Sequence, residues 1–197
     1  MLKQQIIATL LRRNRPDLAN VVAYDEDHHN GTSVGLFIPL PRELAAQRPS
    51  LGDDDSSPAH CTVMYVGDCK DAGPLIASTR RVLAGTRPFR VGLSEAVSYF
   101  EPNENNGQRS VAKLEVLDRR GRGLHQLRAQ LWAAFERDGV EFSDSFPKYE
   151  PHVTLGYLEP GTKYDGERPR GQWMVGSVAL WGFKRDLTLP FGVKAPV

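Results

Sequence analysis

Cysteine is scarce in this sequence, and neither an excess of charge nor a long apolar run occurs in it. Cys61 and Cys69 are the two cysteines among 197 residues, too few for a disulfide framework, which favours a reducing compartment. The formal net charge is +1, so no overall attraction to nucleic acid or to an anionic membrane is expected. No apolar stretch approaches the roughly 20 residues that span a bilayer, and the N-terminus lacks a signal-type cleavage site. We therefore expect a soluble, cytoplasmic protein in which any phosphate recognition is local.

Strands and helices alternate along the sequence in an α+β order. Apolar residues recur at three- and four-residue steps over 71–84 and 121–138, which predicts two helices. Runs of β-branched and aromatic residues predict strands at 34–40, 60–66, 89–93, 96–100, 110–117, 152–158, 173–183 and 187–191, and a short helix is expected near 42–47. Residues 1–31 are expected to form an N-terminal extension, a helix plus a polar turn, and residues 32–197 one domain.

One four-residue motif occurs twice, at residues 60–63 and 152–155. The first copy reads His-Cys-Thr-Val and the second His-Val-Thr-Leu, and a proline comes shortly before each. A single His-x-Thr is common by chance, whereas two copies that each open an apolar strand indicate a paired site. The two halves of the chain also echo each other around these copies, which suggests two related lobes.

Alternation along each strand predicts which side chains share a face. In the first strand, one face is expected to carry His60, Thr62 and Met64, and the other Cys61, Val63 and Tyr65. In the second strand, His152 and Thr154 are expected together, leaving Val153, Leu155 and Tyr157 to the core. Each copy thus offers an imidazole and a hydroxyl side by side, and two copies facing each other would surround a small anion.

Two imidazoles on opposite sides of a phosphorus atom suit the cleavage of a phosphodiester. The reaction needs a base for the attacking oxygen, an acid for the leaving oxygen and hydrogen-bond donors for the phosphoryl oxygens. Histidine titrates near pH ~6.5, so one ring can be neutral and the other protonated at cellular pH. Thr62 and Thr154 can donate to the non-bridging oxygens. This reasoning predicts His60 and His152 as catalytic and the two threonines as phosphate-binding residues.

Metal sites are the weaker interpretation of the sequence. The histidine pair lacks the third protein ligand that catalytic zinc normally has. His28 and His29 are adjacent and seldom converge on one ion, and the aspartates at 53–55 fit a solvated loop. His125 fits the surface of a helix. We expect no metal and no cofactor.

The paired motifs resemble those of the two-histidine (2H) phosphoesterase superfamily, which includes bacterial 2′-5′ RNA ligase-like proteins and cyclic phosphodiesterases. Its signature is a pair of His-x-Thr/Ser-hydrophobic motifs, and residues 151–155, Pro-His-Val-Thr-Leu, are especially similar to the second. The resemblance covers about residues 34–191. It implies a bilobal α+β fold, with two antiparallel-sheet lobes related by pseudo-twofold symmetry and a central cleft between them.

The resemblance implies a metal-independent phosphodiesterase that acts on a nucleotide or RNA end, at a 2′,3′-cyclic phosphate or a 2′-5′ linkage. It makes His60 and His152 the acid and base, in an order that depends on how the substrate lies. Two alternatives remain open: degradation of cyclic oligonucleotide immune messengers, as in some phage-encoded relatives, and a non-catalytic nucleotide-binding module or scaffold. No membrane partner is expected, and the oligomeric state is left open.

Substrate contacts are harder to predict. Phe37, Tyr149 and Trp181 are candidates to stack on a base, as are Tyr99 and Phe183, although each fits a core position too. Two loop cations, Lys148 and Arg109, are candidates to pair with a second phosphate.

Overall fold

The computed structural model describes residues 34–48, 58–69, 71–118, 123–144, 146, 148–183 and 186–192. The predicted N-terminal extension, the His28-His29 pair and the aspartates at 53–55 lie outside the described residues. No helix in the described part of the chain is long and apolar enough to cross a membrane.

Eight strands and three α-helices make up this part of the chain. The strands are β1 (Val34–Pro39), β2 (His60–Gly67), β3 (Phe89–Phe100), β4 (Ser110–Asp118), β5 (His152–Leu158), β6 (Gln172–Val175), β7 (Ser177–Trp181) and β8 (Leu187–Pro190). The helices are α3 (Arg42–Ala45), α4 (Ala72–Ala84) and α5 (Gly123–Asp138), with a 3₁₀ turn at Glu104–Asn106. The two strands expected at 89–93 and 96–100 are one strand, β3, whose pairing with β4 is irregular between Leu93 and Val97.

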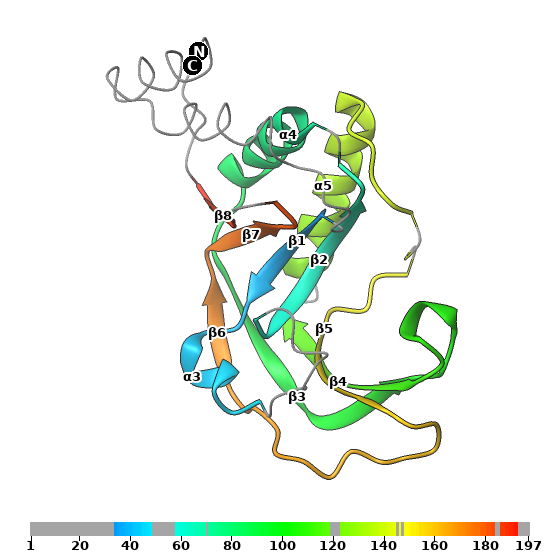
Figure 1. The fold of residues 1–197 in the computed structure, drawn as a ribbon. Helices are drawn as coiled ribbons and strands as arrows, with labels where there is room; N and C mark the ends of the chain where they lie inside the picture. Colours follow the sequence, from blue (N-terminus) through cyan, green and yellow to red (C-terminus); the bar gives the residue numbers. More distant parts are fainter. Residues whose placement is uncertain are drawn as a thin grey trace, which may run out of the picture.

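All eight strands form one antiparallel sheet in the order β6-β3-β4-β5-β2-β1-β7-β8, which curls into a half-barrel (Figure 1). The two motif strands, β5 and β2, are neighbours at its centre. Moving outward from them, each half contributes three further strands, so the halves mirror each other about the β2–β5 junction. The predicted α+β class with two related antiparallel halves is confirmed, and the halves are fused into a single sheet.

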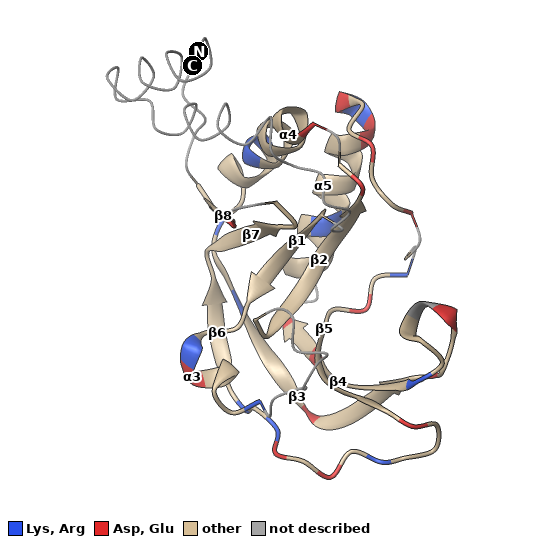
Figure 2. Cartoon of the chain, viewed as in Figure 1, with Lys and Arg blue, Asp and Glu red and all other residues tan. Residues whose placement is uncertain are grey.

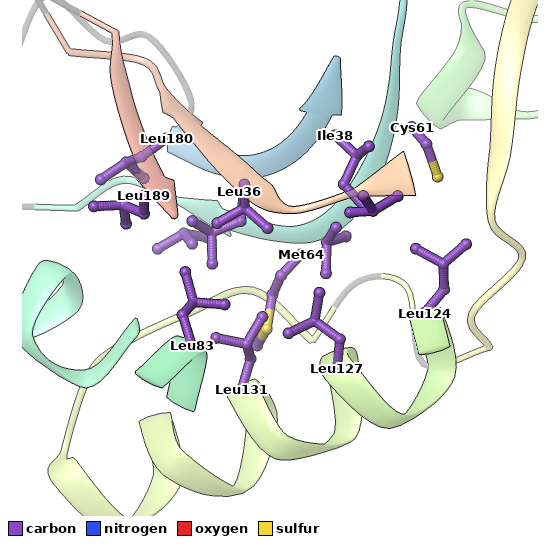
Figure 3. Close-up of a cluster of buried hydrophobic side chains, with 14 of the residues drawn as sticks. Leu36, Ile38, Cys61, Met64, Leu83, Leu124, Leu127, Leu131, Leu180 and Leu189 are labelled. Carbon is purple, nitrogen blue, oxygen red and sulfur yellow. The ribbon is translucent and has the colours of Figure 1, made fainter. Parts of the chain in front are cut away.

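The long helices α4 and α5 pack against each other and cover one face of the sheet. The Asp71 carboxylate caps α4 by accepting a hydrogen bond from the Gly73 amide at 2.9 Å. Leucines of α5 and strand residues interlock between helix and sheet, and Figure 3 shows Leu36, Met64, Leu124, Leu127 and Leu131 there. Burying each such side chain contributes about 1.5–3 kcal/mol, so this face holds the sheet together.

A β-bulge interrupts β2 at Val63, the last residue of the first motif. Thr62 pairs with Phe37 of β1 and Met64 pairs with Leu36, so Val63 has no partner in β1. An extra residue on one strand reverses the alternation beyond it. Met64 therefore turns to the helix side, where it is 1% exposed, while Thr62 keeps its place on the opposite face.

The second motif ends in a bulge at the equivalent position. Thr154 pairs with Lys113 of β4 and Gly156 pairs with Ala112, so Leu155 has no partner in β4. The same reversal follows. The two motifs thus share a backbone irregularity as well as a sequence, which extends the internal symmetry to single residues.

These bulges make part of the predicted alternation wrong. Met64 is a core residue and does not share the face of His60. Tyr65 is half-buried on the Thr62 side, and Tyr157, expected in the core, is 37% exposed. Strict two-residue alternation holds from His60 to Thr62 and from His152 to Thr154, and it fails beyond the bulge in each strand.

Charge is unevenly distributed over the strands (Figure 2). Among the described strands, Lys, Arg, Asp and Glu occur in β3 and β4, and the other six strands carry none. The half of the sheet that contains β2 is therefore uncharged along its strands. Strands with ionic side chains therefore belong only to the half that contains β5.

Candidate active site

The two motifs meet where β2 pairs with β5. The structure pairs Cys61 with Val153 in antiparallel register, and both side chains are fully buried on the helix side. The neighbouring positions of an antiparallel pair run in opposite directions, which sets His60 across from Thr154 and Thr62 across from His152. These four motif residues are all half-buried and share the face turned away from the helices. The arrangement brings two imidazoles and two hydroxyls together from segments far apart in the chain.

Both imidazoles are held in the same way by the backbone that precedes them. Nδ1 of His60 lies 2.7 Å from the Pro58 carbonyl oxygen, and Nδ1 of His152 lies 2.6 Å from the Glu150 carbonyl oxygen. A carbonyl oxygen only accepts, so Nδ1 carries the hydrogen in each ring. Nε2 is then the nitrogen left to accept or deliver a proton, which is the requirement for an acid/base pair.

Burial lowers the pKa of both histidines. For His60 this desolvation outweighs the Pro58 carbonyl, which raises the pKa, and the positive charge of Arg48 lowers it further. For His152 burial again dominates and the Glu150 carbonyl opposes it. The charges of Lys113 and His60 add to the lowering, and the carboxylate charge of Glu150 raises the pKa. A bound phosphate anion counters both effects, so a proton on one ring is favoured when substrate is present.

Aromatic rings surround His60. Phe37 of β1 and Trp181 of β7 stack on each other with centroids 4.6 Å apart and planes at 21°. The His60 ring meets both edgewise, at 4.8 Å from Phe37 and 5.1 Å from Trp181. The pairing of β1 with β2 and β7 brings these rings together. Two predicted substrate contacts, Phe37 and Trp181, therefore lie beside a predicted catalytic histidine.

Charged groups and one aromatic ring surround His152. Phe100 of β3 meets its ring edgewise at 4.8 Å, and the Lys113 ammonium lies 3.5 Å from the centroid of that same phenyl ring. Lys113 is also bound to Glu150, with Nζ 2.8 Å from Oε2, and its side chain is 4% exposed. The other carboxylate oxygen, Oε1, is 2.6 Å from Nζ of the exposed Lys148. Hydrogen bonds from Lys113 and Lys148 lower the pKa of Glu150 to about 2, so this carboxyl is ionised.

Tyr149, expected among the substrate-binding residues, lies on the helix side of β2 instead. Its hydroxyl donates to the Thr62 carbonyl oxygen at 3.2 Å, and its ring contacts Arg128 and His125 of α5. Tyr149 and His125 also line an open hollow of about 470 Å³ whose lining includes neither His60 nor His152. In this position Tyr149 supports the backbone of the first motif from the helix side of the sheet.

The other aromatic and cationic candidates are dispersed. The hydroxyl of Tyr99 accepts a hydrogen bond from the Tyr164 amide, and Phe183 packs against the main core. Arg109 lies over the Tyr157 ring at 4.7 Å, and Lys148 reaches the site only through Glu150. His125 is exposed on α5, as its sequence context predicts.

Lys113, Glu150 and Phe100 lie near His152, although nothing in the sequence pattern predicts this. In the sequence Lys113 stands on the polar positions of an alternating strand, which is the pattern of a solvated residue. The structure buries it because β4 lies between β3 and β5, so its side chain is covered by neighbours from both. Only the pairing of β4 with β5, which sets Lys113 opposite Thr154, indicates that Lys113 lies near the second motif.

No group of three or more His, Cys, Asp and Glu residues in the described part of the chain is arranged to hold a metal ion. The side chains next to the imidazoles include hydroxyls, aromatic rings and an ammonium group, and the Glu150 carboxylate is already paired with Lys113. Such a set suits an anion better than a cation.

Comparisons with known proteins identify the family and the fold. A family model described as the 2′-5′ RNA ligase superfamily matches residues 40–187. A search of curated proteins gave no match.

Solved structures share the fold at low sequence identity. TT0787 of Thermus thermophilus has a TM-score of 0.55 at 19% identity, covering 80% of this chain and 97% of that one. LigT of E. coli, crystallised with 3′-AMP, has a TM-score of 0.52 at 19% identity, covering 81% and 95%. Usb1 of Kluyveromyces marxianus has a TM-score of 0.52 at 10% identity, covering 81% and 97%.

The family match spans both His-x-Thr motifs and most of the sheet. The structure likenesses independently show the same curled antiparallel fold. The chain therefore belongs to the 2′-5′ RNA ligase superfamily, the two-histidine phosphoesterases.

Proposed function

We propose that the protein is a metal-independent phosphodiesterase that acts on a nucleotide or RNA end, at a 2′,3′-cyclic phosphate or a 2′-5′ linkage. The observation that carries this proposal is the junction of β2 and β5, which sets the His60 imidazole across from Thr154 and the His152 imidazole across from Thr62. A phosphoryl group lying over this face of the β2–β5 junction would have an imidazole on either side of phosphorus and a hydroxyl beside each imidazole.

The mechanism follows from which atoms are free. One neutral imidazole accepts the proton of the attacking oxygen at Nε2, while the other, protonated at Nε2, gives its proton to the leaving oxygen. The Nδ1 hydrogen bonds to backbone carbonyls keep both Nε2 atoms directed away from the strand backbone. Thr62 and Thr154 donate to the non-bridging oxygens as negative charge gathers there. His60, His152 and the threonines can thus meet the needs of the reaction without a metal ion.

A nucleotide substrate fits the surroundings of His60. The stacked pair of Phe37 and Trp181 offers apolar rings to a base, and stacking on such rings tolerates any base. The LigT structure with 3′-AMP supports a nucleotide ligand for this fold. We therefore place the nucleoside beside Phe37 and Trp181.

A screen of the EDTA-treated protein tests the proposal. The substrates are 2′,3′-cyclic nucleotides, 2′-5′ dinucleotides, and cyclic di- and trinucleotides, which cover the family activity and messenger degradation. Turnover of at least one substrate in the presence of chelator is expected. Turnover that disappears with chelator overturns the metal-independent mechanism, and binding without turnover across the whole panel indicates a non-catalytic module.

Single substitutions separate catalysis from binding. His60→Ala and His152→Ala are each expected to reduce kcat by about 10²–10⁴-fold, which is the usual contribution of a general acid or base. Substrate binding should remain, since neither change removes the hydroxyls or the aromatic rings. His125→Ala is the matched control, because that exposed histidine lies on α5 away from the two imidazoles.

A further inference from the structure

We propose, resting on the phosphodiesterase function above, that Lys113 is a positioning residue whose buried ammonium, clamped by Glu150, keeps His152 unprotonated, so that His152 accepts the proton of the attacking water and His60 supplies the proton to the leaving oxygen. Neither the two motifs nor their symmetry assigns these roles. The assignment comes from what differs between the two sides of the site.

The first difference is the buried ion pair. Lys113 Nζ lies 2.8 Å from Glu150 Oε2 and 3.5 Å from the centre of the Phe100 ring, and that ring touches the His152 ring. A side chain this buried is ordered and its charge is weakly screened by solvent. Lys148 binds the other carboxylate oxygen but is 85% exposed, so solvent screens its charge. The charge of Lys113 lowers the pKa of His152 more than the carboxylate of Glu150 raises it. A proton on His152 would therefore add a second positive charge near the buried ammonium of Lys113.

The charges that face each imidazole come from several elements. His152 is faced by Lys113 and Glu115 of β4, by Glu150 and Lys148 of the preceding loop, and by His60 of β2. His60 is faced by Arg48, which follows α3, and by His152. Lys113 is the cation among them that is almost fully buried, and it belongs to the side of His152.

The second difference is independent of charge. Phe37 and Trp181 stand beside His60, so a stacked nucleoside places its ribose oxygens on that side of phosphorus. In the hydrolysis of a cyclic phosphate, the oxygen that leaves phosphorus stays on the ribose. The acid must therefore stand on the nucleoside side, and the attacking water enters from the opposite side. The buried ion pair and the aromatic rings therefore both indicate His152 as the base and His60 as the acid.

The step balances without another reactant. A water oxygen forms a bond to phosphorus while its proton passes to Nε2 of His152. The bond between phosphorus and the ribose oxygen breaks, its electron pair stays on that oxygen, and the oxygen takes the proton from Nε2 of His60. Proton exchange with solvent then restores His60 to its protonated form and His152 to its neutral form.

Opposite substitutions in the ion pair give the sharpest test. Lys113→Met removes the cation beside His152 and is expected to raise the lower-pH limb of kcat/KM, the limb of the base, by about one pH unit. Glu150→Gln leaves the cation without its partner and is expected to move the same limb down. Lys113→Arg should restore the limb of the wild type. A merely structural ion pair predicts no limb shift, or shifts of one sign in both variants, and either result overturns the proposal. Arg81→Met, which removes an equal charge from the α4–α5 surface pair with Asp138, is the control.

An activated ester identifies the acid. The leaving phenolate of bis(4-nitrophenyl) phosphate is a weak base and needs no proton. His60→Ala should then lose about 10²-fold or more on a 2′,3′-cyclic nucleotide but less than about tenfold on the ester, while His152→Ala loses activity on both. The reverse pattern overturns the proposal although the protein remains a phosphodiesterase. A wild-type protein inactive on every substrate overturns the proposed function, and this inference with it.

A titration gives a readout that needs no turnover. The imidazole proton resonances of the wild-type protein, assigned with His60→Asn and His152→Asn, are expected to show His152 losing its proton at lower pH than His60. The opposite order overturns the proposal even if the Lys113 variants fail to fold.

Discussion

Cys61 of β2 lies opposite Val153 of β5, and this buried pair joins the two halves of the sheet. Because the motif residues stand immediately to either side of the pair, its register fixes which hydroxyl faces which imidazole. The buried pair belongs to the hydrophobic core beneath α4 and α5, so the motif residues are supported by that core. Burial also raises the pKa of the Cys61 thiol to about 12, which keeps it uncharged beneath the site.

Removing either hydroxyl should weaken catalysis and leave the fold intact. Thr62→Val and Thr154→Val keep the β-branched shape and delete the donor to the phosphoryl oxygen. Each is expected to reduce kcat by about 10²-fold, the scale of one oxyanion donor. Thr→Ser at the same positions keeps the donor and should retain most of the activity. Equal losses in the Val and Ser variants would contradict a hydrogen-bonding role.

The pH dependence of kcat/KM should reflect the lowered pKa of both histidines. Each imidazole loses its proton at lower pH than a free histidine does. The histidine that acts as the base therefore becomes neutral, and active, at lower pH. The histidine that acts as the acid also loses its proton, and its activity, at lower pH. The maximum of kcat/KM is therefore expected below about pH 6.5. The maximum of kcat should lie higher, because bound phosphate raises both pKa values. A kcat/KM maximum well above pH 7 would contradict the lowered pKa of the two histidines.

Loss of the Trp181 ring should affect substrate binding more than chemistry. Trp181→Ala removes one member of the stack with Phe37 and is expected to raise KM by about 5- to 100-fold, equivalent to one stacked base. Tyr149→Phe removes a hydroxyl on the helix side and should lower thermal stability while KM stays near that of the wild type. Steady-state kinetics and a melting curve for both variants check the contrast. An unchanged KM in Trp181→Ala removes the aromatic subsite from the proposal.

Asp138 should account for part of the acid instability. Hydrogen bonds from Arg137 and Ser78, together with the charge of Arg81, lower its pKa from 3.8 to about 2. A carboxyl whose pKa is lower in the folded state than in the unfolded state stabilises the protein when the pH is above the unfolded-state pKa. For Asp138 this contribution is lost as the pH falls from about 4 to 2. Asp138→Asn is therefore expected to be less stable at neutral pH and to show a shallower decline of Tm over that window.

The exposed loop residue Asp144 provides the comparison for that measurement. Asp144→Asn should keep the decline of Tm seen in the wild type. An equally steep decline in Asp138→Asn would show that the ionic contacts of Asp138 contribute little.

Most strands, the long helices and the histidine and threonine of each motif were predictable because each is encoded locally. The single strand expected at 173–183 was wrong: it is two strands, β6 and β7, which lie in opposite halves of the sheet. Apolar spacing predicts α5 to within two residues of its observed start, and His-x-Thr predicts a shared face over three residues of strand. The family resemblance then supplied the pairing of the motifs, which no single segment contains.

What escaped prediction depends on neighbours that are distant in sequence. The bulges at Val63 and Leu155 are visible only once the partners in β1 and β4 are known. Lys113 is a surface residue by its pattern and a buried one by its place between β3 and β5. The position of Tyr149 on the helix side, where its hydroxyl donates to the Thr62 carbonyl oxygen, also depends on a strand that is distant in sequence.

The unpartnered residues Val63 and Leu155 separate each strand into two stretches of opposite orientation. Upstream of them, the imidazole and hydroxyl are tied to the central junction, and downstream the chain can vary its outward side chains without rotating that couple. Substitutions in the outer stretches, which include Tyr65 and Tyr157, can therefore accumulate while the imidazole and hydroxyl of each motif stay in place. The duplication of this break in both halves makes such divergence available twice within one chain.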